Sequence, residues 1–344
     1  MNSFYITRPD DWHVHCRDGE LLSAIVNATG KHFSRALLMP NLLPPLTSVE
    51  AILAYRQRVM DVLIPSVDFV PYMTLYINEA LLADQLHLAK TYPFILGAKL
   101  YPAGVTTNSQ AGVQSIAALY PLLEVMQDLD LVLQIHGEVT FGDIFEREAL
   151  FIETILLPLT RHFPKLRIVL EHISTQVAVE FVEQASQNVA ATITPHHLFY
   201  NRNQLLAGGI RPHYYCLPIL KAERDQLALQ RAAVGGNSKF FAGTDSAPHL
   251  KHTKETACGC AGIFSAPYAL AMYTEVFDNC GQLPQLESFM SRFGADFYQL
   301  PMNQGQIELI KNPQQIPDVL NIGGGQIVPI GAGTALKWSI NECN

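Results

Sequence analysis

The sequence lacks the features that mark secreted, membrane-spanning and disulfide-rich proteins. Its six cysteines are scattered, and only Cys258 and Cys260 lie close together, at a spacing that fits neither a disulfide framework nor a zinc finger. No apolar run approaches the length of a membrane span, and the first residues show no basic segment followed by an apolar one. We therefore expect reduced thiols and a cytoplasmic protein that has no membrane partner.

Charge is also scarce. Only 16% of the 344 residues are charged, the formal net charge is -8, and no run of Lys or Arg stands out. A nucleic-acid-binding protein usually carries a basic patch, so we expect no nucleic-acid partner. Any anionic ligand must be bound by a few local cations. The chain is 49% apolar, enough for a large core, and an α/β barrel is one of the architectures that uses this length as one domain.

Short β-rich runs alternate with longer stretches of helical period, a pattern typical of βαβ units and a parallel sheet. The eight strand candidates are residues 11–15, 35–39, 69–75, 94–100, 131–136, 167–171, 189–194 and 239–243. The helix candidates between them are residues 21–29, 49–63, 79–91, 115–130, 144–162, 176–187 and 223–234. The pattern predicts a (β/α)8 TIM barrel in a single domain, residues 1–344, with a barrel core over about 10–290 and a C-terminal extension over about 291–344.

The segments that join the predicted strands and helices also allow predictions. The run TSVE predicts a capping box in which the Thr47 hydroxyl and the Glu50 carboxylate each satisfy a backbone N–H. The polar stretch 101–112 and the long excursion 195–221 break the alternation. Long loops at the carboxyl ends of barrel strands are usually functional. The Gly/Pro-rich tail shows little pattern beyond a possible hairpin in residues 322–340.

Metal-ligating residue types end the predicted strands. The side chains in question are His13, His15, Lys99, His136, His172 and Asp245. Because the carboxyl ends of parallel barrel strands converge on one mouth, residues far apart in the sequence would meet there. The two histidines of H-x-H point to the same side of the pleat and could grip one metal, although such a pair is more often hydrogen-bonded in a core. Together, these residue types suit zinc.

Lys99 lies in the otherwise apolar run FILGAKLYP, where an unpaired ammonium is costly to bury. Three states remove that cost: a salt bridge, a Schiff-base nucleophile, or carboxylation by CO2 to a carbamate. A salt bridge is the commonest state of an isolated strand lysine. With four histidines and an aspartate nearby, the carbamate balances the charge best, since it supplies an anionic, two-oxygen ligand that can bridge two metals.

Three further residues are candidate substrate binders. Arg17 follows H-x-H and could bind a carboxylate through two hydrogen bonds, although a surface salt bridge is as plausible an interpretation. Asn41 follows the second strand and could instead be a turn residue. His249, four residues after Asp245, could instead make a loop hydrogen bond. His196 and His197 lie in the excursion, and we interpret them as structural.

The motifs DWHVHCRD, MPN, KLYP, HGE, EHIST, ATITPHHL, RPHYYCLPIL and GTDSAPHLKHTKE, followed by CGCAG, occur in this order over nearly the whole chain. In these motifs and in their order, the chain resembles the class II, bacterial-type dihydroorotases of the amidohydrolase superfamily. The resemblance implies a zinc-dependent hydrolase that reversibly cyclises N-carbamoyl-L-aspartate to L-dihydroorotate, the third step of de novo pyrimidine biosynthesis. It also implies a homodimer.

The resemblance also implies a role for each matching residue. His13, His15 and Asp245 would bind the more buried of two zinc ions, and His136 and His172 the second. Lys99, as N6-carboxylysine, would bridge the two ions together with a hydroxide. Asp245 would be the general acid and base of the reaction.

For the substrate, the resemblance implies contacts from Arg17, Asn41, His136, Leu217, His249 and Ala261, of which Leu217 and Ala261 would act through their backbones. Thr106 and Thr107 match a lid over the site. The chain departs from the family pattern at Cys16, where a bulky aliphatic residue is common, at Gly104, where Asn occurs, and at His196, where Gln occurs. None of these departures replaces an implied ligand.

Two alternatives from other function classes remain. A non-catalytic homologue that serves as a scaffold would have no need to keep the complete ligand set. A related cyclic amidohydrolase such as a hydantoinase or an allantoinase would keep the ligands. The combination of Arg17 with Asn41 and His249 favours a substrate that carries a carboxylate. It therefore favours the dihydroorotase over a hydantoinase or an allantoinase.

Overall fold

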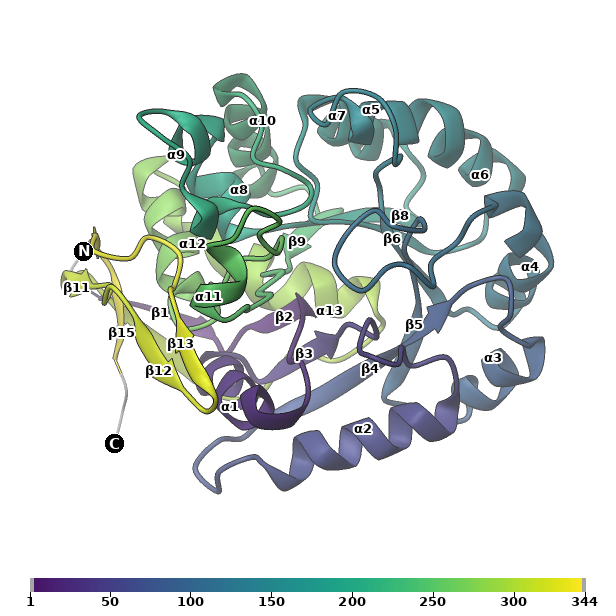
Figure 1. Cartoon of the computed structure of the whole chain (residues 1–344), viewed down its shortest axis with the longest axis horizontal. Coiled ribbons are helices and arrows are strands. Elements are labelled where there is room, and N and C mark those ends of the chain that lie inside the picture. Colours follow the sequence, from purple (N-terminus) through teal and green to yellow (C-terminus); the bar gives the residue numbers. More distant parts are fainter. Residues whose placement is uncertain (1–2, 342–344) are drawn as a thin grey trace.

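The computed structural model describes residues 3–341, and its centre is a ring of eight parallel strands (Figure 1). Neighbouring strands pair in chain order: β2 (Asp10–Val14), β3 (Arg35–Leu38), β4 (Val70–Ile77), β5 (Ile95–Leu100), β6 (Val132–His136), β7 (Ile168–Glu171), β8 (Val189–Ile193) and β9 (Phe240–Ala242). The ring closes where the backbone N–H after β9, at Asp245, donates to the His13 carbonyl of β2 at 2.8 Å. The predicted (β/α)8 barrel is confirmed.

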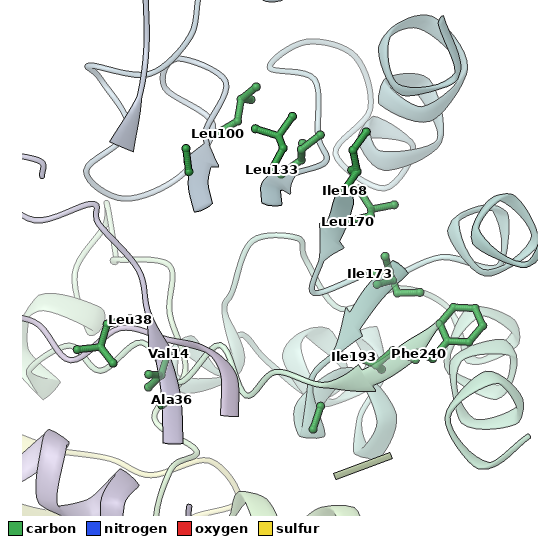
Figure 2. Packing of buried hydrophobic residues seen from close by; sticks show 14 of the residues in the cluster. Val14, Ala36, Leu38, Leu100, Leu133, Ile168, Leu170, Ile173, Ile193 and Phe240 are labelled. Carbon is green, nitrogen blue, oxygen red and sulfur yellow. The ribbon is translucent and has the colours of Figure 1, made fainter. Parts of the chain in front are cut away.

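Helices surround the ring and cover the outer faces of the strands (Figure 1). They are α1 (Leu22–His32), α2 (Val49–Asp61), α3 (Ala83–Lys90), α4 (Tyr120–Asp128), α5 (Arg147–Phe151), α6 (Leu157–His162), α7 (Gln176–Gln184), α10 (Glu223–Val234) and α12 (Ala269–Asn279). Figure 2 shows buried side chains such as Phe240 and Ile173 between the strands and the helices. Burial on both faces explains why the strands are nearly continuous apolar runs.

One predicted helix cap and one predicted helix start were wrong, although α2 begins at Val49 as expected. Ser48, not Thr47, caps α2, because Ser48 is in the extended conformation and its hydroxyl accepts from the Ala51 N–H at 3.2 Å. The helix predicted from residue 79 begins only at Ala83. The carboxylate of Glu79 is used elsewhere, since it accepts from the backbone N–H of Gln114 at 2.7 Å.

The excursion 195–221 contains short helices that the sequence pattern did not indicate: α8 (Pro195–Phe199), α9 (Arg202–Leu206) and a 3-10 turn, η4 (Pro212–Tyr214). The Thr194 side chain caps α8 by accepting from the His197 N–H at 3.1 Å. Asn201 and Gln204 form a capping box at α9. These caps fix the two short helices, and the excursion that contains them carries Leu217 to the pocket.

The C-terminal segment packs against the end of the ring opposite the ligand-bearing strand ends. Tyr298, just after α13 (Phe293–Phe297), stacks on Trp12 of β2 with ring centroids 4.6 Å apart. Gly294 permits this approach, because a Cβ there would lie 2.0 Å from the indole nitrogen of Trp12. These contacts bury the inward-facing aromatic side chains at this end of the barrel.

Beyond α13 the chain forms small antiparallel sheets beside the barrel. β10 (Gln306–Ile310) pairs with β1 (Ser3–Thr7) on one side and with β15 (Ser339–Asn341) on the other. β11 (Gln314–Gln315) pairs with β14 (Ala335–Leu336), and β12 (Leu320–Ile322) with β13 (Gly325–Ile327) as the hairpin expected in the tail. Within residues 3–341, no helix is long and apolar enough to span a membrane.

Candidate metal centre and substrate pocket

The first group of candidate ligands lies where β2 meets the segment after β9. The Nε2 atoms of His13 and His15 lie 3.4 Å apart, and Oδ1 of Asp245 is 3.4 Å from the first and 3.1 Å from the second. All three residues are buried. Burial lowers the pKa of both imidazoles, so they are neutral at pH 7, which is the form that binds a metal. Three converging donors of this kind suit one zinc ion.

A carboxylate behind this group fixes its orientation. Oε2 of Glu171 lies 2.8 Å from Nδ1 of His13 and accepts a hydrogen bond from the Thr192 hydroxyl at 2.5 Å. With Nδ1 engaged by a carboxylate, the free lone pair of His13 is on Nε2, which faces Asp245. Carboxylates commonly hold metal-ligating histidines in this way.

The second group is the pair His136 and His172, whose ring centroids lie 4.7 Å apart. His136 is the last residue of β6, and its Nε2 lies 2.9 Å from Oε2 of Glu138. This contact leaves Nδ1 of His136 as the free ring nitrogen. His172 follows β7, and its ring centroid is 5.0 Å from that of His13, so the two groups adjoin.

The backbone is strained at this site. Among the non-glycine residues with positive φ are Arg17 at 59°, His172 at 43° and Asp245 at 45°. Such conformations cost of the order of 1–3 kcal/mol each and persist where the surrounding structure enforces them. The Asp245 backbone is held by its bond to His13 and that of Arg17 by the Tyr55 hydroxyl, which donates to its carbonyl at 2.5 Å. Three strained residues in one pocket indicate a functional site.

Lys99 lies on β5 between these groups and is fully buried. In the described part of the chain its Nζ has neither a hydrogen-bond partner nor an ion pair, and it lies 4.8 Å from the centroid of the Tyr101 ring. Burial lowers its pKa to about 8. An unpaired buried ammonium is costly, and the charges of Glu171 and Asp245, which act to raise the Lys99 pKa, only partly offset the effect of burial. The Lys99 amine is therefore more easily neutral than that of an exposed lysine.

A pocket opens above these residues and encloses about 340 Å³, including its opening to solvent. The sequence analysis singled out ten of its lining residues: His15, Arg17, Asn41, Thr106, Thr107, His136, His172, Leu217, Asp245 and Ala261. His13 and Lys99 lie beneath it, and His249 is at its edge beside Arg17. Lining residues that the sequence analysis missed are Tyr101, Ala247 and Gly262. The structure therefore brings the predicted ligands and substrate binders together.

Arg17 provides the positive charge in this pocket. Its Nε donates to the Pro248 carbonyl at 3.1 Å, and its Nη2 lies 2.9 Å from Nε2 of His249. The same His249 nitrogen is 3.0 Å from the Ala261 carbonyl, and one ring nitrogen serves only one of these neighbours at a time. Burial, reinforced by the Arg17 charge, lowers the pKa of His249, which keeps its ring neutral. Arg17 can therefore meet an incoming anion without competition from a carboxylate partner.

The loop after β5 folds over this pocket. The Thr107 hydroxyl donates to the Ala261 carbonyl at 3.2 Å, and the Asn41 side-chain amide donates to the Thr107 carbonyl at 3.2 Å. The Asn108 amide donates to the Asn41 carbonyl at 3.3 Å. Thr107 and Asn108 are thus held against residues of the candidate substrate site, while Thr106 bonds within the loop, where its N–H donates to the Ser109 hydroxyl at 2.9 Å.

Sequence reasoning missed the two supporting carboxylates, Glu138 and Glu171. Glu171 directly precedes His172 in EHIST and Glu138 lies two residues after His136 in HGE, and a carboxylate in an apolar context was the available signal. Burial raises the pKa of Glu171 to about 7, against the opposing effect of the Lys99 charge.

His196, His197 and Cys216 form another buried group of possible donors. Both ring nitrogens of His197 have protein neighbours, the Thr194 hydroxyl at 2.8 Å and the Pro218 carbonyl at 3.0 Å. The Cys216 thiol lies 3.2 Å from the same Pro218 carbonyl. His197 and Cys216 are thus engaged by hydrogen bonds, in keeping with the structural interpretation of His197, whereas neither ring nitrogen of His196 has a hydrogen-bond partner among the described residues.

Comparisons with known proteins agree with this arrangement. The model of the amidohydrolase family matches residues 6–316. A dihydroorotase from Nitrosococcus oceani is 53% identical over 344 residues, covering 99% of this chain and 100% of that protein. The solved dihydroorotase from Campylobacter jejuni has a TM-score of 0.92 and 37% identity, covering 99% and 98% of the two chains.

A structure of the dihydroorotase from Saccharomyces cerevisiae, in complex with 5-fluoroorotic acid, has a TM-score of 0.91 and 34% identity and covers 99% of both chains. These similarities extend over the whole barrel and its C-terminal segment, and the motifs of the sequence lie at the barrel mouth. The chain therefore belongs to the amidohydrolase family and, within that family, to the dihydroorotases.

Proposed function

We propose that the chain cyclises N-carbamoyl-L-aspartate to L-dihydroorotate with loss of water, and catalyses the reverse ring opening, in de novo pyrimidine biosynthesis. The observation that carries the proposal is the convergence of two histidine groups, Asp245 and a buried, unpaired Lys99 beneath a pocket that contains Arg17. The two histidine groups, Asp245 and Lys99 suit metal-assisted amide chemistry. Arg17 suits the binding of a substrate carboxylate.

The centre would hold two zinc ions per subunit, one bound by His13, His15 and Asp245 and one by His136 and His172. Lys99 would bridge them after its neutral Nζ attacks the carbon of CO2, forming an N–C bond and losing one proton to give the carbamate. Burial favours the neutral amine that this step requires. When bound, the zinc ions would polarise the ring carbonyl and lower the pKa of a water molecule.

Asp245 would transfer the proton. In ring opening, the oxygen of water bonds to the carbonyl carbon, the C–N bond breaks, and the departing nitrogen gains a proton. Burial acts to raise the Asp245 pKa, but the hydrogen bond with His15 and nearby positive charge outweigh it and leave the pKa lowered. Asp245 is therefore ionised at neutral pH and free to accept the proton of water and pass it to the nitrogen. Cyclisation is the same sequence in reverse.

Arg17, with Asn41 and His249, would bind the α-carboxylate of the substrate, and the backbones of Leu217 and Ala261 would meet the ring amide. The yeast relative that was solved with 5-fluoroorotic acid, a carboxylated pyrimidine, supports such a ligand class. A hydantoinase-like substrate carries no carboxylate for Arg17 to bind, and the partly buried guanidinium would then face the pocket without an anionic partner.

The loop that carries Thr106 and Thr107 would act as a lid. Its bonds to Asn41 and Ala261 hold it over the pocket, and complete closure over a bound substrate would exclude water from the reaction. The homodimer and the cytoplasmic location stay predictions that rest on the resemblance to the family.

The test is a comparison of kcat/KM of the zinc-loaded protein for L-dihydroorotate and for dihydrouracil, which has the same ring without the carboxylate. We expect dihydroorotate to be preferred by at least about tenfold, the lower value for one charge-assisted hydrogen bond. Equal specificity constants, or a preference for dihydrouracil, would favour the hydantoinase-like alternative. Absence of turnover on both substrates with metal bound would favour the scaffold.

A further inference from the structure

Lys254 lies outside the substrate pocket, yet its ammonium joins two of the segments that build it. It is the last residue of α11 (Lys251–Lys254) and is only 3% exposed. Its Nζ donates to the backbone carbonyls of Tyr215 at 3.1 Å, Cys260 at 3.0 Å and Gly262 at 2.5 Å. Tyr215 belongs to the excursion after β8, and the other two belong to the loop after α11.

The Lys254 ammonium has as many carbonyl acceptors around it as it has N–H donors. A lysine ammonium has three N–H groups, and each has one carbonyl here. The Gly262 N–H also donates to the Tyr215 carbonyl, at 3.0 Å. Gly262 has a φ of +146°, and a Cβ there would lie 2.4 Å from the Ala247 carbonyl, so only glycine fits this tightly packed turn. The result is a closely fixed junction between two chain segments.

The residues held at this junction are neighbours of the backbone contacts proposed for the substrate. Leu217 is two residues after Tyr215, and Ala261 lies between Cys260 and Gly262. Leu217, Ala261 and Gly262 all line the pocket, whereas Lys254 does not. The Ala261 carbonyl also accepts from the Thr107 hydroxyl of the lid loop.

We propose that Lys254 is a positioning residue, which holds the backbones of Leu217 and Ala261 at the separation that the ring amide of the substrate requires and presents the Ala261 carbonyl to the lid. The inference rests on the proposed function, since that function supplies the ring amide. Lys254 touches neither the substrate nor the metal centre, so its loss should impair substrate binding and leave zinc binding intact.

Lys254→Met tests this, because Met keeps the apolar stem and removes all three donors. We expect KM for dihydroorotate to rise by about tenfold or more, kcat to change by less than about threefold, and zinc content to stay at the wild-type value. We also expect faster amide hydrogen exchange in residues 213–218 and 259–263 together, with the barrel strands unchanged.

Glu255→Gln is the matched control. Glu255 is adjacent to Lys254, and its Oε1 lies 3.0 Å from Nε2 of His213, so it ties the same two segments at an exposed position. Exposed ion pairs contribute little, so kinetics and exchange should stay near wild type. A control that behaves like Lys254→Met would show that any tie between these segments suffices, and would overturn the proposal.

The proposal is also overturned if Lys254→Met leaves KM unchanged, or if exchange rises uniformly over the whole chain, since both results mean a general contribution to stability. Should the Met variant fail to fold, Lys254→Gln, which keeps two N–H donors on a shorter stem, should show the same raised KM and local exchange; wild-type values would refute the role. If the wild type itself has no dihydroorotate activity, the proposed function fails, while the exchange measurement still tests the junction.

Discussion

Replacing Arg17 with Met should change which substrates the enzyme uses, not only how fast it works. Arg17 is held at the pocket by Pro248 and by the Tyr55 hydroxyl on its own carbonyl, and it lies beside His249. Met approximates the length of the side chain and removes its charge. The open-chain substrate is a dianion and the protein has a formal net charge of -8, so a local cation must offset this repulsion.

The size of the effect follows from the charge-assisted hydrogen bond that this partly buried guanidinium can make. A hydrogen bond to a charged group contributes about 1.5–3 kcal/mol, which corresponds to roughly tenfold to a few hundredfold in kcat/KM. Because Arg17 is only partly buried, solvent screens the pair in part, and we expect the loss on dihydroorotate to lie within this range. Dihydrouracil lacks the carboxylate and should lose far less than dihydroorotate.

The assay is kcat/KM of the wild type and of Arg17→Met on dihydroorotate and on dihydrouracil, with zinc content measured for each protein. Arg58→Met is the control, because Arg58 makes an exposed ion pair with Asp18 next to Arg17, and should leave both values near wild type. Equal losses on the two substrates in Arg17→Met would refute the reasoning, since Arg17 would then recognise no carboxylate.

Other changes separate the remaining roles. Asp245→Asn should retain the fold and much of the zinc while turnover falls by about 10²–10⁴-fold in both directions; near-normal turnover with metal bound would exclude the proton transfer. Glu171→Gln should weaken zinc binding by about 10–100-fold, because it weakens the hold on Nδ1 of His13, and chelator competition measures this. Changing Thr106 and Thr107 to Val should lower turnover more than zinc content; unchanged kinetics would mean that the loop is only a connection.

The barrel and the meeting of the ligands could be predicted from the sequence because a parallel barrel brings all its strand ends to one mouth. Lys99 and His136 were placed correctly on strands by the alternation of apolar runs and helical periods. An error of one or two residues in a predicted strand end does not move a side chain away from the mouth. Strand β2, for example, ends at Val14 and not at His15, yet His15 still lies at the mouth. The geometry of the fold thus tolerates the usual errors of sequence interpretation.

The supporting contacts could not be predicted, because they depend on which side chains face one another across the barrel. Glu171 and His13 are 158 residues apart, and only the closed ring brings Oε2 to Nδ1. Local competition explains the helix cap and the helix start that were predicted wrongly. Ser48 and Thr47 are both good capping residues, and Glu79 is needed at the start of another segment, where no local pattern indicates it.

The central claim is a two-zinc centre bridged by carboxylated Lys99. A crystal structure of the fully active enzyme, with anomalous scattering measured at the zinc absorption edge, tests it most directly. We expect two anomalous peaks per chain, one within bonding distance of His13, His15 and Asp245 and the other of His136 and His172, with density for a carboxylate on Nζ between them. One peak in fully active enzyme, or an unmodified amine on Lys99, would contradict the account.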